Sequence, residues 1–116
     1  MSAGSPSPPK NIVLIGFMGS GKSSIARELS GALGYPMIDT DALIVERAGK
    51  PIRDIFAQEG EDAFREMEST VLRELEESLP PHHIIATGGG IIGRAANREI
   101  LRRMGFVVWL VVSAEE

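Results

Sequence analysis

One eight-residue segment constrains the fold more than any other part of the chain. It reads Gly-Phe-Met-Gly-Ser-Gly-Lys-Ser from Gly16 to Ser23 and matches G-x-x-x-x-G-K-[ST] in full. An apolar, β-rich run precedes it at residues 11–16, and a helical pattern follows at residues 22–33. Glycines let successive backbone N–H groups turn toward a phosphate, and the helix N-terminus adds partial positive charge. The segment therefore predicts a phosphate-binding loop between a buried strand and a helix.

The side chains of this loop predict a nucleotide and its magnesium ion as ligands. Lys22 is expected to reach the outer phosphates and to act in catalysis, and the hydroxyl of Ser23 is expected to hold Mg²⁺. The bland alternative is a glycine-rich connection that binds nothing. The expected nucleotide-binding residues are Gly16, Gly19, Ser20, Gly21, Lys22, Ser23 and Ser24.

Apolar periodicity and the positions of glycine and proline divide the chain into alternating strands and helices. Strands are expected at residues 11–16, 36–39, 83–86 and 106–112, and helices at residues 22–33, 41–48, 51–59, 61–79 and 94–104. Strands joined by helical crossovers lie parallel, so the pattern predicts an α/β domain with a doubly wound parallel sheet covered on both faces. Residues 1–10, rich in proline and serine, are expected to be a disordered lead before a single core at residues 11–116.

Composition excludes several classes of function. The 116 residues include 12 basic and 16 acidic side chains, a net charge of −4, and the scattered lysines form no phosphate-tracking stripe, which disfavours nucleic-acid binding. The chain has no cysteine, and two adjacent histidines are a poor basis for a metal cluster. The longest apolar run has seven residues where a membrane span needs about twenty, so we expect no membrane association and a cytoplasmic location.

Two further segments follow predicted strands and are expected to converge on the phosphate loop, because ligands bind beyond the carboxyl ends of parallel strands. Asp39-Thr40-Asp41 places one carboxylate to face magnesium, through its waters, and another to orient an acceptor hydroxyl or take its proton. The alternative is helix capping by Asp41. Gly88-Gly89-Gly90 presents backbone amides to a small substrate, or simply makes a tight turn.

Three other observations refine the function. The planar fork of Arg65 suits a carboxylate or phosphate, although pairing with its glutamate neighbours on a solvated helix face is the alternative; Phe64 is expected in the core. Residues Gly88 to Gly93 also fit G-x-G-x-x-G, with Glu115 and Glu116 after the next strand, but this dinucleotide-binding reading is the weaker one. No carboxylate follows Ile84-Ile85-Ala86, which disfavours a switch GTPase, whereas Lys22 together with Asp39 and Asp41 favours phosphoryl transfer to a small molecule.

Together these segments resemble the shikimate kinases, small P-loop enzymes of aromatic amino-acid (chorismate) biosynthesis. The resemblance covers residues 11–116 and rests on four stretches in the family's order: Gly16 to Ser23, Asp39-Thr40-Asp41, Gly60-Glu61 to Phe64-Arg65 to Glu68, and Thr87-Gly88-Gly89-Gly90. It implies ATP as co-substrate, with Lys22 at the transferring phosphate and Mg²⁺ held by Ser23 and, through water, by Asp39. It also implies that Asp41 holds the hydroxyls of shikimate, Arg65 grips its carboxylate, Glu68 supports Arg65, and Gly88, Gly89 and Gly90 line the pocket.

The family continues past the fourth strand with a lid, further arginines, an adenine-contacting loop and a fifth strand, whereas this sequence stops at Glu116. We therefore expect a fragment or a short form, without the last strand and lid, whose fourth strand is an apolar edge prone to pairing. The leading hypothesis is a monomeric, ATP-dependent shikimate kinase. The alternatives are a catalytically incomplete nucleotide-binding module, a kinase of another small hydroxy acid such as gluconate, and the dinucleotide-binding reading.

Overall fold

The computed structural model describes residues 11–16 and 22–110. In chain order the elements are β1 (Ile12–Gly16), α1 (Lys22–Leu33), β2 (Met37–Asp39), α2 (Thr40–Ala48), α3 (Ile52–Glu59), α4 (Glu61–Ser78), β3 (Ile84–Ala86), the 3₁₀ helix η1 (Ile91–Gly93), α5 (Ala95–Met104) and β4 (Phe106–Leu110). Every predicted strand and helix is present. The predicted disordered lead, Gly19, Ser20 and Gly21, and the last two residues of the predicted fourth strand lie outside the described residues.

The described strands form one parallel sheet in the order β2-β3-β1-β4. The first strand of the chain is therefore an inner strand, with Leu14 opposite Ala86 of β3 on one side and Val108 of β4 on the other. Parallel pairing requires a crossover between successive strands, and the helices supply those crossovers. The predicted parallel sheet is confirmed.

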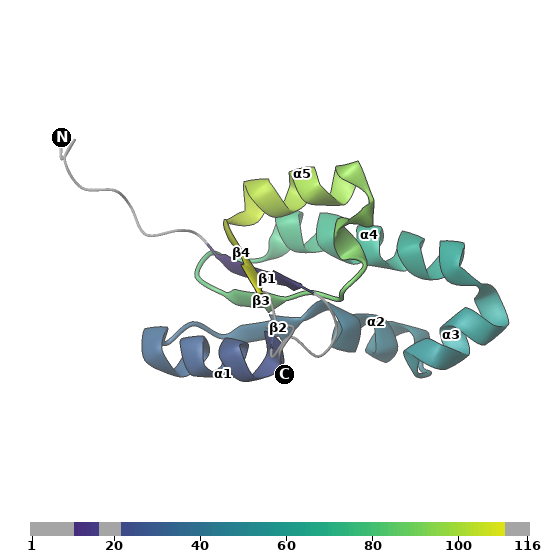
Figure 1. Ribbon diagram of the computed structural model, residues 1–116, viewed down its shortest axis with the longest axis horizontal. Helices are drawn as coiled ribbons and strands as arrows, with labels where there is room; N and C mark the ends of the chain where they lie inside the picture. Colours follow the sequence, from purple (N-terminus) through teal and green to yellow (C-terminus); the bar gives the residue numbers. More distant parts are fainter. Residues whose placement is uncertain (1–10, 17–21, 111–116) are drawn as a thin grey trace, which may run out of the picture.

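Helices cover both faces of the sheet, which confirms the doubly wound arrangement. Figure 1 shows α4 and α5 on one side of the strands and α1 on the other. Val13 and Ile15 of β1 pack with apolar side chains of the α4 and α5 side, whereas Leu14 packs with Ala26 of α1. Successive side chains of a strand point to opposite faces, so a strand covered on both faces has to be apolar throughout. Phe64 is buried in the first of these clusters, as predicted.

The junction between β2 and α2 differs by one residue from the prediction. Helix α2 begins at Thr40, and the residue that caps it is Asp39, whose Oδ1 accepts hydrogen bonds from the backbone N–H groups of Asp41 (2.9 Å) and Ala42 (3.2 Å). Asp41 lies inside the first turn of the helix. The alternative that Asp41 is the capping residue is therefore wrong, because α2 begins at Thr40, directly after β2 ends at Asp39, and includes Asp41.

At the amino end of the sheet, Asn11 joins three segments. Its Nδ2 donates to the carbonyl of Met104 (3.0 Å), its Oδ1 accepts from the N–H of His83 (2.9 Å), and its main-chain oxygen accepts from the N–H of Phe106 (2.9 Å). Gly105 passes so close that a Cβ atom there would lie 2.1 Å from that oxygen. Only glycine fits between α5 and β4.

No helix in the described ranges combines the length and the apolar character that crossing a membrane requires.

Candidate active site

The glycine segment after β3 lies against two charged side chains from different helices. A Cβ atom built on Gly88 would lie 2.6 Å from Oδ1 of Asp41, and one built on Gly90 would lie 2.5 Å from Nη1 of Arg65. The backbone of the segment therefore packs directly against both groups, at Gly88 and at Gly90, which Gly89 separates in the sequence. The start of α2, the first turns of α4 and the loop after β3 meet at the carboxyl end of the sheet, which confirms the predicted convergence of two of the three segments.

The third segment, the phosphate loop, is described at its two ends only. Gly16 is the last residue of β1 at the same end of the sheet, and Lys22 and Ser23 are the first residues of α1. Ser24 follows in the helix and is exposed. A loop that enters a helix at this point delivers its ligand to the helix N-terminus, where backbone N–H groups have no partner within the helix.

Asp39 and Thr40 provide oxygen atoms at the end of β2 and the start of α2. The side chain of Asp39 is fixed by its capping bonds to α2. Thr40 is fully buried, and its Oγ1 has no hydrogen-bond partner in the part of the chain that the structure describes. Carboxylate and hydroxyl oxygens are ligands that suit a hard cation such as Mg²⁺.

A magnesium ion would rely on few protein ligands here. Across residues 11–16 and 22–110, no three His, Asp or Glu side chains are grouped so that they could hold a metal ion. This matches the way in which Mg²⁺ usually binds in phosphoryl-transfer sites, through one or two protein oxygens, retained waters and the phosphates of the substrate. The donor set at Asp39 therefore fits such an ion.

Arg65 is held by two glutamates of its own helix. Its Nη1 donates to Oε1 of Glu68 at 2.9 Å, and its Nη2 donates to Oε2 of Glu61 at 3.3 Å. The side chain of Glu68 is 1% exposed, that of Arg65 is 25% exposed and that of Glu61 is 65% exposed, so Glu68 makes the stronger contact. The hydrogen bond to Glu68 raises the pKa of Arg65. The glutamate pairing of the alternative is therefore present, but the guanidinium is only 25% exposed and also lies against the backbone of Gly90, so it is not on a fully solvated face.

The three charged groups of the site influence one another. Burial raises the pKa of Glu68, the hydrogen bond and positive charge of Arg65 act in the opposite direction, and the negative charge of Asp41 adds to the rise. Asp41 and Arg65 thus lie against the same backbone segment, at Gly88 and Gly90, and Glu68 holds Arg65 from its own helix. Such a site can bind an anionic group through Arg65 and hydroxyl groups through Asp41.

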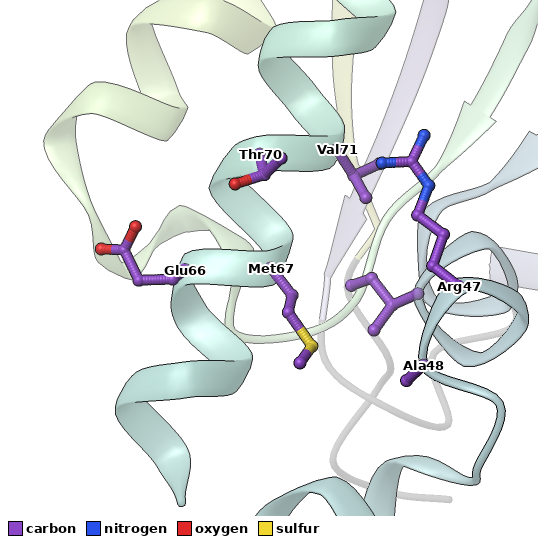
Figure 2. Close-up of a pocket in the computed structure, with 7 residues that line it drawn as sticks. Arg47, Ala48, Glu66, Met67, Thr70 and Val71 are labelled. Carbon is purple, nitrogen blue, oxygen red and sulfur yellow. The ribbon is translucent and has the colours of Figure 1, made fainter. Parts of the chain in front are cut away.

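A separate pocket lies between α2 and α4 (Figure 2). It has a volume of about 240 Å³, and none of the predicted site residues lines it. Arg47 at its rim pairs with Glu74 and Glu66 pairs with Arg94, so neither charge is directed to a ligand there. The lining residues are Ile44, Arg47, Ala48, Glu66, Met67, Thr70 and Val71.

Sequence reasoning missed three buried polar residues next to the site. Thr87 donates from Oγ1 to the carbonyl of Leu14 (2.8 Å) and so ties the end of β3 to β1. Ser69 donates from Oγ to Oδ1 of Asn97 at 2.8 Å, which links α4 to α5. A signal was present for Asn97, because it stands where the apolar stripe of α5 requires a core residue, three and four positions before Ile100 and Leu101.

Comparison with known proteins decides the family. A family model described as shikimate kinase matches residues 18–116 of the chain. The chain belongs to the shikimate kinase family. The resemblance carried by its four motif stretches is thereby confirmed, and so is the predicted fold class.

Individual shikimate kinases agree with this assignment. The shikimate kinase of Symbiobacterium thermophilum is 49% identical over 105 residues, which cover 90% of this chain and 59% of the relative. The structure of "Shikimate kinase from Acinetobacter baumannii in complex with shikimate" matches with a TM-score of 0.86 and 42% identity, over 94% of this chain and 59% of that chain. A gluconokinase from Sinorhizobium meliloti shares the fold alone, with a TM-score of 0.55, 24% identity and coverage of 93% and 61%.

The chain thus spans about three fifths of the length of the shikimate kinases that it matches.

Proposed function

We propose that this chain carries the nucleotide and acceptor sites of a shikimate kinase, which transfers the γ-phosphoryl group of ATP to a hydroxyl of shikimate. The observation that carries the proposal is the placement of Arg65 and Asp41 on one backbone wall, Gly88 to Gly90. Shikimate offers a carboxylate at one end and hydroxyl groups at the other. The guanidinium of Arg65, which a buried glutamate holds in place, suits the carboxylate. The carboxylate of Asp41 suits the hydroxyls, because it accepts hydrogen bonds.

The nucleotide side of the proposal rests on the phosphate loop. Backbone N–H groups of Gly16, Gly19, Ser20 and Gly21 would surround the phosphates, with Ser24 completing the turn into α1. Lys22 would neutralise charge on the transferring group, and Ser23 and Asp39 would hold Mg²⁺, the latter through water. When bound, the ion supplies charge neutralisation at the phosphates.

In the proposed reaction the bond between the γ-phosphorus of ATP and its β–γ bridging oxygen breaks, so that ADP leaves, while a bond from phosphorus to the acceptor oxygen forms. The acceptor hydroxyl loses its proton. Asp41 holds that hydroxyl by a hydrogen bond and is the nearest candidate to receive the proton. Phosphoryl transfer depends mainly on positioning and on charge neutralisation, which is what Arg65 and Asp41 provide on the acceptor side.

The deciding experiment is ADP release from Mg-ATP with and without shikimate, measured in a coupled assay. We expect release that requires shikimate, that disappears in Lys22→Ala and that falls by about 100-fold in Arg65→Ala, the range expected for the loss of a charged contact. Arg73→Ala is the matched control, because Arg73 is an exposed arginine of the same helix that contacts only Thr70 among the described hydrogen bonds.

Other outcomes select the alternatives. Binding of MgADP without any shikimate-dependent release would identify a nucleotide-binding module without catalysis. Faster release with gluconate than with shikimate would identify a kinase of another hydroxy acid. A rise in melting temperature with NAD but not with ATP would support the dinucleotide-binding reading.

We also propose that the enzyme acts as a monomer in the cytoplasm, without nucleic acid or membrane partners. Support comes from the described site, since Asp41, Arg65, Glu68, Gly88 and Gly90 all come from one chain.

A further inference from the structure

Asn97 is a buried polar residue whose side-chain nitrogen and oxygen each form a hydrogen bond. It lies near the start of α5 with 1% of its surface exposed. Its Nδ2 donates to the carbonyl of Ile91 at 2.9 Å, and its Oδ1 accepts from Oγ of Ser69 at 2.8 Å. Burying an amide is unfavourable unless it forms hydrogen bonds, so this group has a fixed place between its two partners.

Both partners of Asn97 are chain neighbours of residues in the candidate site. Ile91 is the first residue of η1 and directly follows Gly90. Ser69 lies in α4 directly after Glu68, the residue that holds Arg65. The amide therefore connects the two walls between which the Arg65 guanidinium lies.

The guanidinium of Arg65 is in close contact with both walls. On one side Nη1 of Arg65 is 2.9 Å from Glu68, and on the other a Cβ atom on Gly90 would lie 2.5 Å from the same nitrogen. A shift of η1 toward α4 would push the guanidinium out, and a shift away would leave its outer side without support. An arginine has many rotamers, so its position depends on such walls.

Ser69 is also fixed by a second contact. Its Oγ accepts from Nη1 of Arg94 at 3.3 Å, and the same nitrogen donates to Oε2 of Glu66 at 2.9 Å. Ser69 is itself buried, whereas the Arg94–Glu66 pair is largely exposed and contributes little. The Asn97–Ser69 bond is therefore the buried polar link between α4 and the segment that contains the glycines.

We propose that Asn97 is a positioning residue: through Ile91 and Ser69 it sets the distance between the Gly90 backbone and α4, and so holds Arg65 in the orientation that binds a carboxylate. That the carboxylate belongs to shikimate rests on the proposed function. The position of Arg65 is independent of the proposed function, because it can be measured without any ligand.

The chain offers a matched control in Asn11. This asparagine is also buried and also forms two side-chain hydrogen bonds, to Met104 and His83, but it lies at the opposite end of the sheet. Asn97→Ala and Asn11→Ala therefore remove similar bridges. Ser69→Ala is a milder second variant, because it removes the link to α4 and leaves the bond between Asn97 and Ile91.

The experiment compares these three variants with the unchanged chain by two measurements. The first is the NMR signal of the Arg65 Nε–H group without ligand, assigned by its loss in Arg65→Lys. The second is the dissociation constant for shikimate set against that for MgADP. We expect Asn97→Ala and Ser69→Ala to shift and broaden the Arg65 signal and to weaken shikimate binding about tenfold, while MgADP binding changes by less than about twofold. Asn11→Ala should leave the signal and both constants unchanged.

An unchanged Arg65 signal in Asn97→Ala and Ser69→Ala would overturn the inference, as would an equal disturbance in Asn11→Ala, which would indicate general loosening. If Asn97→Ala does not fold, Ser69→Ala decides. If the unchanged chain fails to bind shikimate, the proposed function fails, and the Arg65 signal still decides the role of Asn97. In an Arg65→Ala background, Asn97→Ala should cause no further loss of shikimate affinity.

Discussion

Arg65 is held on one side by a carboxylate and on the other by backbone that carries no side chain. Glu68 supplies a hydrogen bond from a buried position, and Gly90 supplies a surface that the guanidinium can touch directly. Long charged side chains usually sample many rotamers, and ordering one of them is unfavourable. A residue held in this way is preorganised for a planar anionic partner such as a carboxylate.

The substitution Gly90→Ala tests the contact with the glycine wall. The added methyl group would meet Nη1 of Arg65 at 2.5 Å, and the flexible end of that side chain would move away. We expect shikimate binding to weaken about tenfold while the free energy of unfolding falls by less than about 1 kcal/mol. Titration calorimetry and urea unfolding measure the two effects. Gly93→Ala is the control, since a Cβ there meets nothing within 4 Å, and an equal loss of binding in it would contradict the explanation.

The substitution Glu68→Gln tests the electrostatics. Burial raises the pKa of Glu68 above its usual 4.5, so the folded chain keeps a proton there at pH values where the unfolded chain has lost it. The stability that this group contributes is fully present below the unfolded pKa and is lost as the pH rises through the folded pKa. The unfolding free energy should therefore fall across this window in the unchanged chain relative to the variant, whose amide does not titrate.

Urea unfolding from about pH 4 to about pH 8 measures both curves. The control is Glu77→Gln, which alters an exposed glutamate of the same helix, and its curve should run parallel to that of the unchanged chain. Parallel curves for Glu68→Gln as well would show that the carboxylate titrates alike in the folded and unfolded states.

How far the residues of the site could be predicted depends on where their partners lie in the chain. Asp41 and the glycines could be proposed from local motifs, whereas the role of Arg65 could be proposed only from the resemblance to the family. Whether the Arg65 side chain is solvated or held in place depends on Gly90 and on the hydrogen bond between Ser69 and Asn97. Gly90 and Asn97 are far from Arg65 in the sequence, so no local pattern reveals these contacts. Asn97 interrupts an apolar stripe, and such an interruption is the local sign that a long-range polar contact leaves in a sequence.

At the scale of the elements, the residues of the short junctions determine where helices and strands begin and end. The bounds of most elements could be predicted to within a residue because Gly34, Gly49 and the prolines stop helices for local reasons. The residue that caps α2 could not be predicted, since Asp39 and Asp41 are equally good caps in sequence and the choice depends on where β2 leaves the sheet. The junction of α5 and β4 depends on close approach to Asn11, for which a lone glycine gives no local sign.

The substitution Gly105→Ala tests that junction. A Cβ at this position would lie 2.1 Å from a backbone oxygen, which cannot move without disturbing both β1 and β4. We expect the free energy of unfolding to fall by about 3 kcal/mol, at the upper end of the usual cost of overpacking. Gly31→Ala is the matched control, because Gly31 lies in α1 with nothing within 4 Å, and there alanine should stabilise the chain by about 0.5 to 1 kcal/mol. Equal effects of the two changes on the urea midpoint would refute the close-approach argument.

At the scale of the whole molecule, the alternation of strands and helices predicted a parallel sheet but not the order of its strands. That order depends on pairings such as Ile12 with Phe106, which no local pattern specifies. It leaves β4 at one edge of the described sheet, with Phe106 61% exposed and Trp109 55% exposed. The predicted apolar edge is confirmed. Exposed edge strands of this kind are templates for pairing with other chains.

The substitution Trp109→Lys tests whether this edge drives self-association. We expect the unchanged chain, a monomer when dilute, to associate as its concentration rises, and a lysine on the edge to reduce that association, since charged edge residues oppose strand pairing. Sedimentation velocity at increasing concentrations measures the effect. Leu33→Lys is the control, because Leu33 is a similarly exposed apolar residue of α1. Equal loss of association in both variants would point to general stickiness instead of strand pairing.

The inner position of β1 has a consequence for the order of events in time. Strand β1 precedes both of its partners, β3 and β4, in the chain and is therefore synthesised before them. While the ribosome extends the chain, α1 and the following helices can form turns locally, but the sheet that they cover has no centre until residue 106 has emerged. The apolar strand therefore stays unpaired until β3 is made and incompletely paired until β4 follows, a period in which a nascent chain is open to chaperones and to aggregation.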